Sequence, residues 1–174
     1  MNDDSFFNFS NYFPKGVHAV LSKKGITGQN PNSYRIKKCL VALGLNSSQV
    51  SIPRQTHSDN VSTVPSLEII EETDGLITME KNLVLTLSVA DCVPVFISDE
   101  KTGHIGLIHS GWKGTAKNIC CNGIKKFTEN GSDSGDISAF LGPSICGNCY
   151  EIGEDTADYF RNNGLYQLTD EKWL

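Results

Sequence analysis

The 174-residue sequence has no long apolar run, no excess of basic residues and few histidines. No segment approaches the roughly 18 apolar residues of a membrane-spanning helix, so we expect no association with a membrane. Acidic residues outnumber basic ones by 20 to 15, and the net charge of −5 argues against a protein that binds duplex nucleic acid through a basic face. Four histidines are too few for a self-contained multi-copper cluster.

The chain has the length of one compact domain, and we expect residues 1–174 to form a single domain. Its first residues, Met1 to Asp4, are acidic where a secretory signal peptide would be basic, so we expect a cytoplasmic protein. In that compartment cysteines are thiols or metal ligands rather than disulfides. The six cysteines are Cys39, Cys92, Cys120, Cys121, Cys146 and Cys149.

Hydrophobic periodicity predicts short strands with a few helices between them. Alternating or β-branched runs predict strands at residues 17–21, 50–52, 60–64, 83–88, 93–98, 104–109 and 137–141. Helical spacing predicts helices over 36–43, capped by Asn32 or Ser33, over 116–127, capped by Thr115, and over 154–161. Residues 99–103 suit a hairpin loop. We therefore predict an α+β fold with a mixed, mainly antiparallel sheet and flanking helices.

Three segments each place a potential metal ligand at a predicted strand end or turn: His57, Cys92 and His109. Two imidazoles and a thiolate suit zinc and leave a fourth position for water, whose pKa the ion lowers toward neutrality. The ligands lie 35 and 17 residues apart, so spacing alone is a weak signal. The spacing equally allows purely structural roles: His57 in a turn, Cys92 as a small buried residue and His109 as a hydrogen-bonded histidine at a strand end.

The segment after His109 predicts an anion site. Gly111, Lys113 and Gly114 lead into the helix expected to begin near Thr115, and a helix start offers free N–H groups to a phosphate. The lysine adds a full positive charge. We count Lys113, Gly114 and Thr115, with Arg54 from the His57 segment, as candidate phosphate-binding residues; a tight turn with a solvated lysine is the alternative.

Cys146 and Cys149 have the C-x-x-C spacing of zinc-ribbon and redox sites. No second pair completes a four-ligand zinc site. Because they follow the loop-like segment 141–144, we expect them to lie in a loop near the site rather than to form a redox centre, and we assign them no role.

Five motifs occur in an order that resembles a known family, the laccase-like polyphenol oxidases, now regarded as purine nucleoside phosphorylases with adenosine deaminase activity. The motifs are QTHSDNV at 55–61, DGLIT at 74–78, ADCVPV at 90–95, HSGWKGT at 109–115, and LGPSI through CYEIG at 141–153. The resemblance implies a layered α+β sandwich and a zinc site formed by His57, Cys92 and His109. It also implies phosphorolysis of adenosine, guanosine, inosine and S-methyl-5′-thioadenosine, and hydrolytic deamination of adenosine.

The sequence departs from the family pattern in three places. Lys113 stands where arginine is usual, which keeps the charge but loses bidentate phosphate geometry. Cys146 to Asn148 replace a more common Gly-Pro-Cys. Family members also continue beyond Leu174, so we expect residues 1–174 to be a catalytic domain that lacks the C-terminal part usual in the family.

The leading hypothesis is a zinc enzyme that takes a purine nucleoside and phosphate, with Asp91, Cys92 and Lys113 as catalytic residues. Asp91 or Asp74 would shuttle protons, and Lys113 would hold phosphate for attack at C1′ of the ribose. The oligomeric state stays open.

Three alternatives use the same residues. Cys92 could be the nucleophile of a cysteine hydrolase with His109 as its base. Two histidines and a cysteine are also the ligand set of blue copper, although only Met1 and Met79 exist as axial ligands, so copper stays possible. The third alternative is a non-enzymatic binding module with a structural metal.

Overall fold

The computed structural model describes residues 6–23, 37–38, 40–41, 44, 49–65, 69–162, 168–169 and 172–173. The strands are β1 (Phe6–Asn8), β2 (Val20–Ser22), β3 (Val50–Pro53), β4 (Val61–Thr63), β5 (Ile69–Ile70), β6 (Gly75–Thr78), β7 (Val84–Leu85), β8 (Val93–Asp99), β9 (Ile105–Ser110), β10 (Ile137–Leu141), β11 (Leu168–Thr169) and β12 (Lys172–Trp173). The helices are α2 (Trp112–Ala116), α3 (Ile119–Glu129) and α4 (Glu154–Asn162), with short 3₁₀ turns η1 (Ser10–Tyr12), η2 (Ser134–Asp136) and η3 (Gly147–Cys149).

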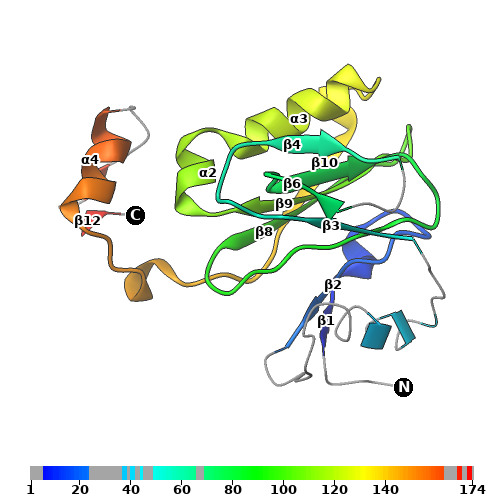
Figure 1. The fold of residues 1–174 in the computed structure, drawn as a ribbon, viewed down its shortest axis with the longest axis horizontal. Helices are drawn as coiled ribbons and strands as arrows, with labels where there is room; N and C mark the ends of the chain where they lie inside the picture. Colours follow the sequence, from blue (N-terminus) through cyan, green and yellow to red (C-terminus); the bar gives the residue numbers. More distant parts are fainter. Residues whose placement is uncertain are drawn as a thin grey trace.

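A five-stranded sheet in the order β10-β8-β9-β6-β4 forms the centre of the fold (Figure 1). Only the β4–β6 pair is parallel, so the predicted α+β class with a mixed, mainly antiparallel sheet is confirmed. The predicted hairpin loop is also confirmed, since β8 and β9 pair in antiparallel register on either side of it. The Asp99 carboxylate stabilises this loop by accepting hydrogen bonds from the amides of Lys101 and Thr102.

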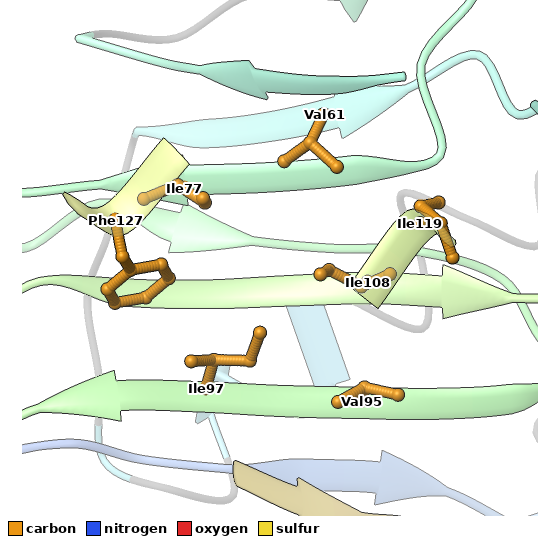
Figure 2. Close-up of a cluster of buried hydrophobic side chains, with 7 residues drawn as sticks. All are labelled: Val61, Ile77, Val95, Ile97, Ile108, Ile119 and Phe127. Atoms are coloured by element: carbon orange, nitrogen blue, oxygen red, sulfur yellow. The ribbon is translucent and has the colours of Figure 1, made fainter. Parts of the chain in front are cut away.

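Helix α3 covers one face of this sheet and closes the main hydrophobic core (Figures 1 and 2). Alternate residues of a strand point to the same face, so Val95 and Ile97 of β8 lie beside Ile108 of β9 under the helix. The core comprises Val61, Ile77, Val95, Ile97, Ile108, Ile119 and Phe127. This packing fixes the strands whose ends carry the predicted ligands.

The opposite face of the sheet packs against a second layer. A three-stranded parallel sheet, β5-β3-β7, adjoins a smaller buried cluster of Val64, Leu76 and Leu83. Aromatic side chains of the N-terminal segment cover the β8–β10 end, where Phe9 lies 4.9 Å from Phe140 between ring centroids. The result is a layered arrangement in which the central sheet is covered on both faces.

Several predicted elements have different bounds in the structure. The strands expected at 17–21 and 83–88 are reduced to β2 and β7. The helix expected over 116–127 is interrupted at Asn118, whose left-handed backbone (φ 64°) separates α2 from α3. The prediction of Thr115 as a cap is wrong, since α2 begins after Gly111 and contains Thr115. The helix expected over 36–43, with its caps, lies largely outside the described residues.

In the described part of the chain, every helix is too short or too polar to cross a bilayer.

Candidate metal centre

The structure brings the three predicted ligands together. One donor atom from each of His57, Cys92 and His109 lies within 4.8 Å of the others. In a tetrahedral zinc site, bonds of about 2.0–2.3 Å place such donors roughly 3.5 Å apart, so a small inward movement is enough to share an ion. His57 is exposed, Cys92 is half-buried and His109 is buried, so the group opens to solvent on the His57 side.

Strand register explains how Cys92 and His109 meet. In the β8–β9 hairpin, Pro94 pairs with His109 and Val93 pairs with Ser110. Continuing that register by one residue places Cys92 opposite Gly111. Both ligands therefore lie at one end of two neighbouring strands, held by the same backbone pairing that builds the core.

Gly111 makes room for the ligands to converge. A Cβ atom at this position would lie 2.9 Å from Cδ2 of His57 and 3.2 Å from Sγ of Cys92. The first distance is closer than carbon atoms normally approach without bonding. The absent side chain thus leaves space for two ligand side chains that come from distant parts of the sequence.

Asp74 orients His109 from behind. Register between β6 and β9 places this aspartate beside the histidine, and its buried Oδ1 lies 2.8 Å from Nδ1 of His109. A carboxylate at one ring nitrogen leaves Nε2 free to face an ion and increases its basicity. Asp74 is therefore built to fix the orientation of a ligand.

The same carboxylate also holds the loop that carries His57. It accepts hydrogen bonds from the amides of Thr56 (3.1 Å), His57 (3.1 Å) and Ser58 (2.7 Å), and from the Ser58 hydroxyl (2.8 Å). His57 adopts a left-handed backbone (φ 59°), an unfavourable conformation for most residues that these bonds compensate. One buried carboxylate thereby positions both histidines.

The electrostatics of the site follow from these contacts. Burial raises the pKa of Asp74, but its hydrogen bonds to His109, Ser58 and Thr56 outweigh burial and hold that pKa below its usual value. Burial, followed by the charges of Asp91 and Asp74, raises the pKa of the Cys92 thiol. Without a cation beside it, Cys92 is a weak thiolate donor, whereas a divalent ion would reverse that preference.

The candidate phosphate-binding residues lie in different environments. Lys113 is exposed, with Nζ 5.5 Å from the Trp112 ring centroid. The amide and hydroxyl of Thr115 both donate to the Gly111 carbonyl, at 2.8 and 2.9 Å. Gly114 is buried, and a Cβ there would lie 2.8 Å from the Ser58 carbonyl oxygen, which shows that it permits close packing of the His57 loop.

The fourth candidate, Arg54, is already paired with an acidic residue. It forms an exposed ion pair with Glu71 at 3.3 Å. Arg54 and Asp91 both line a broad groove between the N-terminal segment and the central sheet. Asp91 is exposed next to Cys92, and its carbonyl accepts a hydrogen bond from the Ile145 amide at 3.0 Å. That bond brings the segment containing Cys146 and Cys149 to the Asp91–Cys92 turn.

Two residues near the site were not singled out from the sequence. Tyr150 lies near Cys92 and Asp91; burial and the charges of these two residues raise its pKa. The Gln55 side chain exchanges two hydrogen bonds with the backbone of Ser88, at 2.9 and 2.8 Å, and so connects the His57 loop to the segment before Cys92. Both lie in motifs that carry the family resemblance, at residues 55–61 and 141–153, and this membership was the only indication of a role that the sequence offered.

The fold and the site together define an α+β protein with a His₂Cys group suited to a metal ion. The donor types and the space left by Gly111 fit such an ion. The sequence profile of the family described as multi-copper polyphenol oxidoreductase laccase matches residues 30–172. The chain belongs to this family, which confirms the resemblance seen in its motifs.

Two curated relatives and one solved structure illustrate the similarity. The purine nucleoside phosphorylase YlmD of Bacillus subtilis is 40% identical over 118 residues, which cover 62% of this chain and 42% of the relative. Adenosine deaminase RL5, from an unknown prokaryotic organism, is 32% identical over 129 residues, covering 68% and 49%. The structure of Bacillus licheniformis protein YfiH superposes with a TM-score of 0.72 at 33% identity, covering 77% of this chain and 54% of YfiH. This chain therefore spans about half the length of the relatives it matches.

Proposed function

We propose that this chain carries the metal centre of a purine nucleoside phosphorylase that also deaminates adenosine. The observation that carries the proposal is the open His57–Cys92–His109 group, backed by a buried carboxylate. The names of YlmD and RL5 support the two activities. The substrates would be adenosine, guanosine, inosine and S-methyl-5′-thioadenosine, with inorganic phosphate as the second substrate of phosphorolysis.

We propose zinc as the ion. Two imidazoles and a thiolate with one open position are the ligands of catalytic zinc, which supplies Lewis acidity and a nucleophile at neutral pH. Blue copper sites usually add a weak axial methionine. Met79 lies at the far end of β6 from Asp74, roughly 16 Å away at the rise of a strand, and Met1 lies outside the described residues. Copper-loaded protein that stays colourless would support this choice.

The chain's own residues would divide the remaining work. Asp74 would keep Nε2 of His109 turned toward a bound ion. The Asp91 carboxylate, exposed beside Cys92, would take and return a proton during deamination at C6 of adenosine. Tyr150, whose pKa is raised, keeps its phenolic proton at neutral pH and can donate it in a hydrogen bond to the substrate.

Phosphate binding would depend mainly on Lys113. Its exposed ammonium is free to turn from the Trp112 ring toward an anion, and the first amides of α2 lie next to it. Thr115 contributes less, because its donors are already used by Gly111. Arg54 would contribute only if a substrate group in the groove displaced Glu71.

A cysteine hydrolase is the competing function. Its nucleophile would be Cys92, but the raised pKa of that thiol disfavours the thiolate that such an enzyme needs. Activity that is lost with a chelator and restored by zinc would exclude it.

The decisive assay follows adenine and inosine released from adenosine in the presence of phosphate. We expect Cys92→Ala to abolish both products, and Cys121→Ala, which removes an exposed thiol on α3, to leave both unchanged. Undiminished formation of adenine and inosine by Cys92→Ala would refute the proposed function.

A further inference from the structure

Cys146 and Cys149 form a second chemical group, separate from the metal ligands. Both side chains are exposed, and their sulfur atoms lie 2.8 Å apart across the short turn η3. A disulfide bond is about 2.05 Å long, so only a slight movement separates these thiols from a bond. Among the described cysteines, no other pair has its sulfurs in contact in this way.

The remaining described cysteines provide an internal comparison. Cys120 and Cys121 are adjacent on α3, where neighbouring residues point in different directions and cannot readily bond. Cys120 is half-buried and its thiol lies 3.8 Å from the Ser110 hydroxyl, whereas Cys121 is exposed. Exposure alone therefore does not distinguish the C-x-x-C pair; the approach of two thiols does.

We propose that Cys146 and Cys149 are a thiol–disulfide exchange site that reacts with small-molecule disulfides such as oxidised glutathione. The inference does not depend on the proposed function. It also differs from the interpretation of this segment as a loop of no redox role, because sequence spacing gives no information on the distance between the two sulfurs.

The exchange proceeds in two steps. The Cys146 thiolate attacks one sulfur of the small disulfide, forming a mixed disulfide and expelling one thiolate. Cys149 then loses its proton to solvent and attacks the Cys146 sulfur, which closes the intramolecular bond and releases the second thiolate. The protein loses two electrons and two protons, and the small disulfide becomes two thiols.

The order of attack follows from the surroundings of the two thiols. A hydrogen bond with Cys149, aided by the amides of Cys149 and Asn148, lowers the pKa of Cys146. The same contact raises the pKa of Cys149. Cys146 is thus the attacking thiol and Cys149 the resolving one, as is typical of a C-x-x-C pair.

A disulfide between Cys146 and Cys149 would affect the neighbouring metal centre, because the two cysteines lie close to it. The segment begins at Ile145, whose amide donates to the Asp91 carbonyl, and leads directly into Tyr150, whose pKa is raised by burial and by the charges of Cys92 and Asp91. A closed bond would restrict the turn between these two contacts.

The test treats the purified, metal-loaded chain with oxidised glutathione and then titrates free thiols in denaturant with a chelator. We expect the titre to fall from six thiols to four, dithiothreitol to restore six, and peptide mapping to join Cys146 to Cys149. Cys149→Ser should instead retain one glutathione on Cys146, while Cys121→Ser should behave as the unaltered chain apart from its missing thiol. A titre that stays at six, a bond to any other cysteine, or no adduct in Cys149→Ser would overturn the proposal.

Discussion

Replacing Asp74 by asparagine would test the carboxylate that positions both histidines. Asp74 is fully buried and has two oxygens, each of which serves more than one partner. If the new amide nitrogen replaces Oδ2, it faces the amides of Thr56 and Ser58. If it replaces Oδ1, it faces the amide of His57 and Nδ1 of His109. The first orientation removes two hydrogen bonds. The second removes the bond from His57, and His109 keeps its bond only if Nδ1 accepts, which places the ring proton on Nε2, the nitrogen that would face an ion.

The magnitude follows from the lost bonds and the lost charge. Hydrogen bonds to a charged group contribute about 1.5–3 kcal/mol each and those to a neutral group about 0.5–1.5 kcal/mol, so losing at least one bond and the charge behind the others should lower the free energy of unfolding of metal-free Asp74→Asn by about 3 kcal/mol or more. Loss of an outer carboxylate typically weakens metal binding about 10- to 100-fold, and we expect the same here. The affinity is measured by competition with a chromophoric chelator, and the stability by urea unfolding followed by circular dichroism.

Two variants serve as controls. Ser58→Ala removes one hydroxyl donor to the Asp74 carboxylate and should cost about 1.5–3 kcal/mol, so it remains measurable if Asp74→Asn does not fold. Glu71→Gln removes an exposed charge paired with Arg54 and should change stability by less than about 1 kcal/mol, with no effect on metal affinity. Unchanged metal affinity and stability in Asp74→Asn would refute the positioning role.

Three further predictions address the glycine, the lysine and acid. Gly111→Ala should lower the metal content measured by atomic emission, because its Cβ would crowd His57, whereas Gly147→Ala, with open space around it, should not; equal contents would contradict the crowding. Lys113→Ala should raise the KM for phosphate about tenfold or more with little change in adenosine deamination, and an unchanged KM would exclude Lys113 from phosphate binding. Because the pKa of Asp74 is depressed in the folded state, its contribution is complete above about pH 4 and is lost below it. Urea midpoints of metal-free protein should fall less steeply below pH 4 in Asp74→Asn, and parallel curves would contradict this.

The β8–β9 half of the site could be predicted from the sequence. Residues 99–103 predict a hairpin loop, and counting outward from it in antiparallel register brings Cys92 opposite Gly111, two residues beyond His109 and on the same face of the sheet. Both strands also showed the apolar pattern that fixes which face is buried. The proximity of Cys92 and His109 therefore follows from the pairing of two neighbouring strands.

His57 could not be placed in the same way. It lies in a loop whose conformation depends on three amides that donate to the Asp74 carboxylate. Asp74 is 17 residues further along the chain, just before β6. Periodicity gives no information on such a contact between side chain and backbone. From the sequence Asp74 is expected only to shuttle protons, whereas its hydrogen bonds commit both oxygens to holding the site.

The interruption between α2 and α3 was missed for a related reason. The apolar positions from Ala116 to Phe127 follow helical spacing without a break. The backbone, however, leaves the helical conformation at Asn118. Asn118 adopts a left-handed conformation that asparagine tolerates better than most residues. Asn118, the third residue of the helix predicted over 116–127, was the available signal.

The most direct test of the central claim measures the metal bound by the purified chain and by single alanine variants of His57, Cys92 and His109. We expect the unaltered chain to bind one ion and each variant to bind it much more weakly or not at all. The cobalt-substituted protein should show a thiolate-to-metal charge-transfer absorption, which replacement of Cys92 abolishes and replacement of any other cysteine leaves unchanged. One tightly held ion in all three variants, with that absorption unchanged in Cys92→Ala, would contradict the assignment of these residues as a shared metal site.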